Sequence, residues 1–196
     1  MRPMRAEPVP TWTAGQRRLH WLTAALVLSA FPLGWLMTAV PLQALLLKFL
    51  LYQMHKTLGI IVLACVVARL LMRARTGRPD WDAGLPDWQR RAAVTMHILL
   101  YAALLAVPML GYLTGCTAPA RMPTLFLGLI PVPHILPADR AWFSVLRPTH
   151  QWSAVFLVVL AGGHALASLH NHLRGHASLR RMWSGQVAGF IPPGSE

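Results

Sequence analysis

Four long apolar stretches limit what this 196-residue chain can fold into. A helix needs roughly 20 apolar residues to cross about 30 Å of hydrocarbon. We expect such spans over about 18–39, 50–71, 92–114 and 149–171. Because a backbone in lipid must satisfy its hydrogen bonds internally, these stretches should be helices. They predict an all-α integral membrane four-helix bundle, with residues 1–196 forming one transmembrane domain.

The charge pattern predicts how the bundle is oriented. Only 12% of the residues are charged, against about 25% in a soluble domain, yet the net charge is +12. The basic residues lie between the apolar stretches, so they indicate topology and exclude a nucleic-acid partner. Twelve of them fall at the chain ends and in loop 72–91, and four in the other connections. We therefore expect both termini and loop 72–91 in the cytoplasm and loop 115–148 on the outer side, with the helices among membrane lipids.

Histidines in the apolar stretches indicate a function, because an ionisable side chain in lipid is costly. His150 and His164 share one span and are 14 residues apart. On an α-helix this interval is a rise of about 21 Å and returns to within roughly 40° of the same face. One helix thus presents an imidazole near each membrane surface. This arrangement suits two stacked haems.

Depth then pairs the histidines of different spans. His20 begins the first span and should lie level with His164, on the cytoplasmic side. His55 begins the second span and should lie level with His150, on the outer side. Each pair predicts the two axial ligands of one b-type haem, held between helices. Zinc and copper also bind histidine, but zinc gathers its ligands at one place. No C-x-x-C-H motif is present, so the haems would be bound non-covalently.

Other residues share these faces and depths. Gly34 follows His20 by 14 residues and Gly59 lies one turn below His55, so both leave room for a porphyrin edge, although glycines in membrane helices also serve close packing. Arg69 follows His55 by 14 residues and is a candidate partner for an inner haem propionate. Lys56 and Arg147 are its outer counterparts.

Two further features lie outside the four histidines paired by depth. His97 begins the third span near the inner layer, and we favour a packing or interfacial role over a role with a quinone or a proton. The stretch 122–137 holds four prolines and is too short and broken to span. We expect it to lie on the outer surface or dip into it as a cap.

Short motifs across about 12–190 make the chain resemble the bacterial dihaem cytochrome b561 family, which is related to the cytochrome b subunits of nickel-iron hydrogenases. They are R-L-H-W-L at 18–22, H-K-T-L-G at 55–59, A-R-L-L-M-R at 68–73, H-I-L-L-Y at 97–101, P-M-L-G-Y at 108–112 and the His150/His164 spacing. The resemblance implies that His20, His55, His150 and His164 ligate two b haems. It gives His97 no axial role, and it implies a bacterial inner membrane with loop 115–148 in the periplasm. One type in this family is a superoxide oxidase that passes electrons from periplasmic superoxide to ubiquinone, and other members are electron relays.

The outer surface bears on the electron donor. It would carry five basic residues against one acidic residue, Asp139: Lys48, Lys56, Arg121, Arg140 and Arg147. Such a field would steer a small anion such as superoxide, although these residues could equally bind propionates or lipid headgroups. No residue is identified as catalytic; Lys48, Lys56 and Arg147 would steer superoxide.

Three functions follow in order of preference. The first is a superoxide:ubiquinone oxidoreductase that works by outer-sphere electron transfer. The second is a relay subunit between a protein donor, such as a dehydrogenase, hydrogenase or periplasmic cytochrome, and quinone. The third is a haem-free channel or transporter, for which the two layers of histidines would have no explanation.

Overall fold

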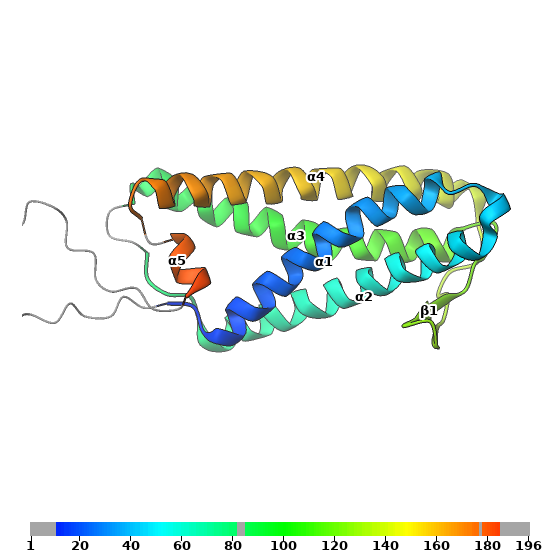
Figure 1. Ribbon diagram of the computed structural model, residues 1–196, viewed down its shortest axis with the longest axis horizontal. Helices are drawn as coiled ribbons and strands as arrows, with labels where there is room; N and C mark the ends of the chain where they lie inside the picture. The colour runs from blue at the N-terminus through cyan, green and yellow to red at the C-terminus, as the bar shows by residue number, and fades with distance from the viewer. Residues whose placement is uncertain (1–10, 82–84, 177, 185–196) are drawn as a thin grey trace, which may run out of the picture.

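A computed structural model describes residues 11–81, 85–176 and 178–184. Four long antiparallel helices form the molecule (Figure 1): α1 (Ala14–Ala39), α2 (Leu45–Thr76), α3 (Asp87–Thr117) and α4 (Arg140–Leu173). Each is long and apolar enough to cross a membrane, which confirms the four predicted spans. A 3₁₀ turn, η1 (Leu42–Ala44), links α1 to α2, and the short helix α5 (Ser178–Trp183) follows α4.

The two ends of the bundle differ. We call the end where α1 begins and α4 ends the terminal end, and the opposite end the hairpin end (Figure 1). At the terminal end, Gln16 donates from Nε2 to Thr76 Oγ1 at 2.9 Å, so the start of α1 is tied to the end of α2. Helix α5 lies there too, where Trp21 donates from Nε1 to the Met182 carbonyl at 3.1 Å.

Helix α4 begins nine residues before the predicted span. Its first turn is capped by Asp139, whose carboxylate accepts hydrogen bonds from the backbone N–H groups of Ala141 and Trp142. This cap satisfies N–H groups that a helix start leaves without partners. The helix therefore starts before Pro148 and includes that proline. The start predicted at 149 marked the edge of the apolar stretch and not the start of the helix.

The apolar core lies midway along the bundle. Val62 and Val66 of α2 pack with Ala103, Leu104 and Val107 of α3 and with Leu157 of α4. In each helix these residues fall between the two histidine depths. The core therefore separates the two predicted layers and holds the helices together between them.

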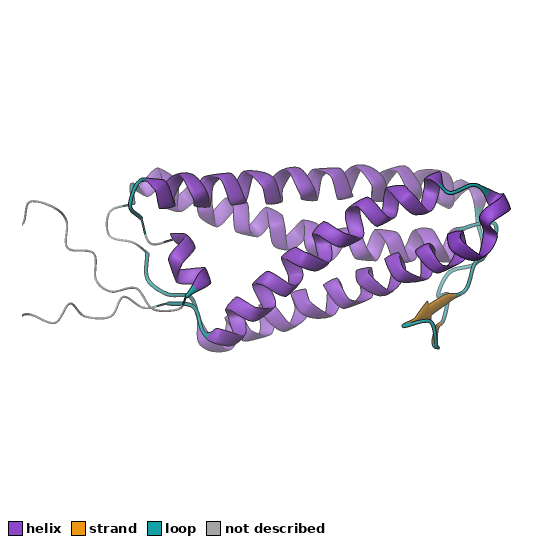
Figure 2. Ribbon diagram, in the orientation of Figure 1, coloured by secondary structure: helices purple, strands orange, loops and turns teal. Residues whose placement is uncertain are grey.

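A β-hairpin lies beside α2 near the hairpin end and was not predicted from the sequence (Figure 2). Strand β1 (Thr124–Phe126) pairs antiparallel with β2 (Ile130–Val132), and Gly128 turns the chain at φ 74°. Gln53 of α2 holds the hairpin: its Nε2 donates to the Pro123 carbonyl at 2.8 Å and its Oε1 accepts from the Leu125 N–H at 2.9 Å. The proline-rich stretch does not span, and it is built as a strand pair beside α2; its place at the membrane surface stays a prediction.

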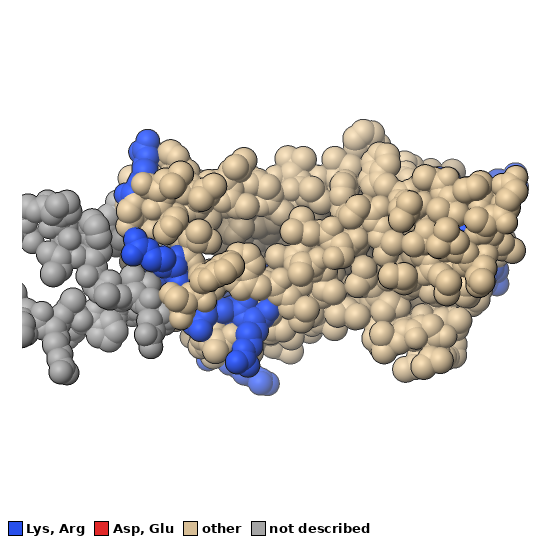
Figure 3. Space-filling view, viewed as in Figure 1, with Lys and Arg blue, Asp and Glu red and all other residues tan. Residues whose placement is uncertain are grey.

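Charged side chains lie toward the two ends of the face drawn in Figure 3. On the face drawn in Figure 3, Lys and Arg gather at the two ends, and the length between them shows neither. Large apolar side chains are exposed along that length, among them Leu28 and Val159. An apolar belt between charged ends is the surface expected of a protein that spans a bilayer.

Candidate cofactor-binding site

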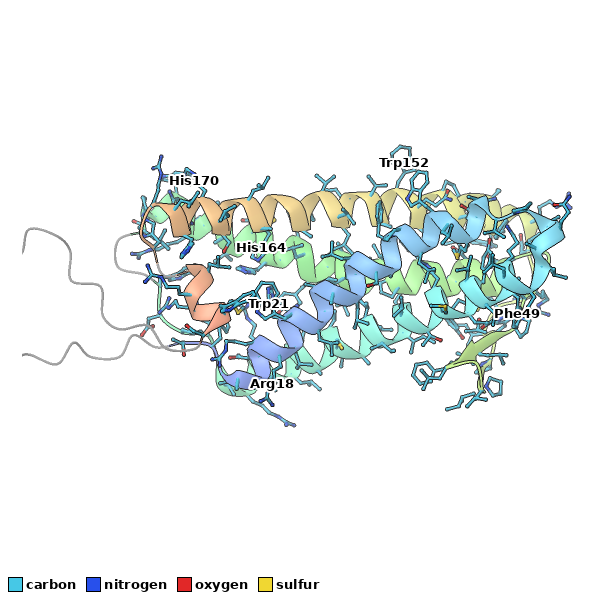
Figure 4. The ribbon with its side chains drawn as sticks, in the orientation of Figure 1. Arg18, Trp21, Phe49, Trp152, His164 and His170 are labelled. Atoms are coloured by element: carbon cyan, nitrogen blue, oxygen red, sulfur yellow. The ribbon has the colours of Figure 1, made fainter. Side chains whose placement is uncertain are left out.

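The structure brings the four predicted ligand histidines together as two pairs. At the hairpin end, the ring centroids of His55 and His150 lie 6.1 Å apart, with an angle of 79° between the ring planes. At the terminal end, His20 and His164 lie 6.3 Å apart at 68°. Figure 4 shows His164 directed from α4 into the bundle, whereas Trp152 of the same helix points away from it. Helix α4 contributes one histidine to each pair.

Backbone carbonyls orient both rings at the hairpin end. Nδ1 of His55 donates to the Ala30 carbonyl of α1 at 3.0 Å, and Nδ1 of His150 donates to the Val107 carbonyl of α3 at 3.0 Å. A carbonyl can only accept, so the proton of each ring lies on Nδ1. Nε2 is then left with a lone pair for a metal. Metal-ligating histidines are held in this way, with the second ring nitrogen bonded to a carbonyl or carboxylate.

Glycines make room for the same two rings. A Cβ at Gly34 of α1 would lie 3.1 Å from Cε1 of His55, and one at Gly111 of α3 would lie 2.9 Å from Cε1 of His150. Each glycine is one helical turn beyond the carbonyl that its histidine bonds. The structure thus places the His55 ring against Gly34, where we had expected open space. A Cβ at Gly59, by contrast, would meet nothing within 4 Å.

Gly111 was missed in the sequence, although a signal for it was present. It follows His97 by 14 residues, the same interval that separates Gly34 from His20. Applying that interval to every span would have identified it.

The terminal-end pair is held by charged and aromatic side chains. Arg69 of α2 lies 3.2 Å through its Nη2 from Nδ1 of His20. Arg69 also lies over the ring of Tyr101 at 5.3 Å. His97 packs against His164 with ring centroids 5.2 Å apart, so this layer holds a third histidine.

The spacing of both pairs fits one iron between two imidazoles. A metal–imidazole bond is about 2 Å, and the ligating nitrogen lies about 1 Å from the ring centroid, so opposed rings on one metal have centroids roughly 6 Å apart. Both pairs meet this distance. In the parts of the chain that the structure describes, no three His, Cys, Asp or Glu side chains gather closely enough to hold a metal ion by themselves. The donor sets therefore suit a group that is ligated on two opposite sides.

The predicted cationic residues lie at the hairpin end in different surroundings. Lys48 donates from Nζ to the Val40 carbonyl at 2.6 Å, and so caps the end of α1. Lys56 donates from Nζ to the Met122 carbonyl at 3.0 Å, below the hairpin. Arg147 is exposed on α4.

A cavity of about 360 Å³ opens beside the hairpin and was not predicted. Its lining includes Arg121, Thr124 and His134. The pKa of His134 lies below its ordinary value, because burial disfavours the charged ring and the nearby Lys56 and Arg121 repel it. His134 is therefore neutral near pH 7, and the charge around this cavity comes from Lys56 and Arg121.

A membrane-spanning helical bundle with two half-buried histidine pairs between its helices is typical of the membrane cytochromes b. The sequence profile of the prokaryotic cytochrome b561 family matches residues 11–185, and the chain belongs to this family. Cytochrome b561 homolog 1 of Escherichia coli K12 is 27% identical over 168 residues, which cover 84% of this chain and 92% of the relative. Cytochrome b561 homolog 2 of the same strain is 31% identical over 154 residues, covering 78% and 80%. The protein is thus a multi-pass membrane electron-transfer protein of a family that carries b-type haem.

Proposed function

We propose that this protein oxidises superoxide at the periplasmic face of the inner membrane and reduces ubiquinone within the membrane. Two superoxide anions would give two molecules of oxygen and two electrons. One ubiquinone would take those electrons and two protons to become ubiquinol. The observation that carries the proposal is the cationic cavity at the hairpin end, which Arg121 lines and beside which Lys56 donates to the Pro123 carbonyl.

We assign two b haems to the two histidine pairs. His55 and His150 would be the axial ligands at the hairpin end, and His20 and His164 those at the terminal end. With both axial positions filled, each haem would supply one-electron, outer-sphere transfer and no site for oxygen at the iron. The carbonyls of Ala30 and Val107 would fix the hairpin-end rings in the tautomer that can ligate.

Other residues of the two layers would hold the cofactors in place. Arg69 would pair with a haem propionate at the terminal end, as would Lys56 and Arg147 at the hairpin end. The space at Gly59 would receive a porphyrin edge. Gly34 would act indirectly, by admitting the His55 ring.

We assign the terminal end to the cytoplasm and the hairpin end to the periplasm, so both chain termini are cytoplasmic. The excess of basic residues at the terminal end supports this orientation. The hairpin end still carries Lys48, Lys56, Arg121, Arg140 and Arg147. Its acidic residue Asp139 is engaged in capping α4. The resulting positive field would raise the rate at which an anion arrives.

The test is optical and uses the purified, haem-loaded protein in its oxidised form. A calibrated flux of superoxide is added, and the b-haem absorption is followed with and without ubiquinone. Rapid reduction followed by reoxidation by ubiquinone supports the proposal. A haem-loaded protein that superoxide does not reduce refutes it, and directs the search to a protein donor that this cytochrome would serve as a relay.

The ligand assignment is tested by haem content. Replacing either His55 or His150 by Ala should leave about one haem per chain and remove the same spectral component in both variants. Replacing His20 or His164 should remove the other component. A pair whose two variants lose different components is assigned wrongly.

A further inference from the structure

The turn of the β-hairpin exposes three large apolar side chains. Leu129 is 82% exposed, and Leu127 and Ile130 are each more than half exposed. The stretch 122–137, which contains the hairpin, has no Asp, Glu, Lys or Arg, and Figure 3 shows the hairpin as an uncharged projection from the side of the bundle. Turns in water usually carry polar residues or glycine, so this turn is built for apolar surroundings.

The backbone of the turn gives a second sign of those surroundings. Leu127 has a φ of 54°, in the left-handed region where glycine and asparagine are usually found. A leucine held there carries backbone strain, and its exposed side chain gains nothing from water. Contact between that side chain and an apolar medium would offset the strain.

The hairpin lies along the side of α2 and does not project beyond the end of the bundle (Figure 2). Its turn is bonded to α2 through the Leu127 N–H, which donates to Thr57 Oγ1 at 3.1 Å. Thr57 lies 12 residues beyond the start of α2, which is a rise of about 18 Å. The exposed side chains of Leu46 and Leu50 lie nearer the hairpin end than Thr57, so the apolar surface of α2 extends past the turn. The turn therefore lies at a depth where the bundle faces lipid.

The hairpin also meets the main requirement for backbone in lipid, which is that its polar groups find partners within the protein. The Leu125 N–H points away from β2 and donates to Gln53 Oε1 at 2.9 Å. Opposite Leu125 in β2 lies Pro131, which has no N–H to satisfy. Within the turn, the Leu129 N–H donates to the Phe126 carbonyl at 3.1 Å. These positions need no water, whereas the edge of a hairpin in water is normally solvated.

We propose that the turn of the hairpin inserts into the leaflet at the hairpin end, with Leu127, Leu129 and Ile130 among the acyl chains of membrane lipids. The hairpin is then an anchor beside α2. Lipid is the occupant that fits, because the turn stands level with the apolar surface of α2 and residues 125–132 hold no polar side chain that would orient a protein partner. The proposal rests on the membrane-spanning bundle and does not depend on the electron donor or acceptor.

An anchored turn also fixes the cavity at the base of the hairpin. Pro123, Thr124, Pro131 and Val132 line that cavity and belong to the hairpin or to the residue before it. Gln53 holds the base of the hairpin through hydrogen bonds, and lipid holds its turn. With two fixed points, the hairpin keeps one wall of the cavity in place against α2.

The experiment measures what surrounds the turn in the full-length, haem-loaded protein. Leu129→Cys is labelled with the fluorophore NBD and reconstituted into phosphatidylcholine vesicles, with or without lipid that bears a nitroxide on its acyl chain. Val159→Cys, on the exposed belt of α4, is the control for lipid. Ala120→Cys, exposed just after α3, is the control for water. Protein without an added cysteine should take up little label, because Cys65 and Cys116 are buried.

We expect the nitroxide lipid to lower the emission of the label at residue 129 by about twofold or more, as at residue 159, and iodide in the water to quench the label at residue 120 alone. Iodide quenching at residue 129 as strong as at residue 120 places the turn in water and overturns the proposal. A label at residue 129 that neither quencher reaches is covered by protein, such as a second copy of this chain, and this result also overturns it. If Leu129→Cys does not hold haem, Ile130→Cys takes its place with the same criteria.

Discussion

Gly111→Ala is the substitution that tests the hairpin-end layer most directly. The added Cβ would lie 2.9 Å from Cε1 and 3.2 Å from Nδ1 of His150. Contacts between non-bonded carbons are normally about 3.5–4.0 Å, so the ring must withdraw by roughly 0.6 Å or more. The ring is held by the 3.0 Å hydrogen bond to Val107, and a shift of that size takes this bond to the limit of hydrogen-bond geometry.

The size of the effect follows from this conflict. Inserting a methyl group into a filled site costs about 1–3 kcal/mol. If this free energy is lost from haem binding, the affinity for haem falls roughly 5- to 150-fold at the hairpin layer. Gly34→Ala should have a smaller effect, because its Cβ would lie 3.1 Å from the His55 ring.

The assay is haem content per chain, by pyridine haemochrome, together with the rate of haem transfer to an apo-acceptor. The matched control is Gly162→Ala on α4. A Cβ added at Gly162 meets nothing within 4 Å, and Gly162 lies about 200° around the helix from His164. We expect Gly111→Ala to lose haem faster than wild type and Gly162→Ala to match wild type. If Gly111→Ala and Gly162→Ala hold haem equally well, the close approach of His150 to α3 is not part of the site.

Four further predictions concern separate parts of the molecule. Arg121→Gln should lower the rate of haem reduction by superoxide about threefold at low salt, with no difference at high salt; a salt-independent difference would exclude steering. Because the pKa of His134 is lowered on folding, the native state binds fewer protons than the unfolded state as pH falls below about 6.5, so stability falls there. The His134→Gln variant should therefore lose less stability than wild type between about pH 7.5 and about pH 5, as measured by thermal unfolding. Parallel curves of stability against pH for the two proteins would contradict this. Gln53→Leu leaves a carbonyl and an N–H of the hairpin without their partner and should cost about 1–3 kcal/mol, measured by thermal unfolding; an unchanged midpoint would show that the hairpin is held elsewhere. Arg69→Gln removes a positive charge beside His20 and should lower the midpoint potential of one haem by about 50 mV or more in a redox titration, with the other unmoved.

Regular features of the fold could be read from the sequence because they follow from repetition along a helix. The four spans are long and apolar, and depth alone matched His20 with His164 and His55 with His150. The structure places both pairs at the spacing described above. Rise per residue and rotation per residue were sufficient for this.

Features that depend on contacts between distant segments could not be read in this way. The hairpin is held by Gln53, about 70 residues earlier in the chain, and a stretch with four prolines shows no alternating strand pattern. Arg69 was placed correctly at the terminal layer, but its contact with His20 depends on how α1 crosses α2. Side-chain partners across helices are set by packing, which periodicity does not describe.

A 14-residue interval recurs in all four helices, and the residues that it places differ between the two layers. Each helix carries a histidine at one layer and a second residue of the site 14 positions later at the other: His20 and Gly34, His55 and Arg69, His97 and Gly111, His150 and His164. At the hairpin layer the added residues are the two glycines, so the ligand rings press against bare helix backbone.

At the terminal layer the corresponding positions hold a guanidinium and a third imidazole. Arg69 brings positive charge beside His20, which would favour the reduced state of a haem held there. The backbone carbonyls at the hairpin layer would strengthen His55 and His150 as electron donors to a haem iron, which would favour its oxidised state. With the two proposed haems in place, the layers would therefore favour electron flow from the hairpin end to the terminal end. His97 adds a third imidazole at the terminal layer, packed against His164, so a haem held there would meet a ring that has no counterpart at Gly111 of the hairpin layer.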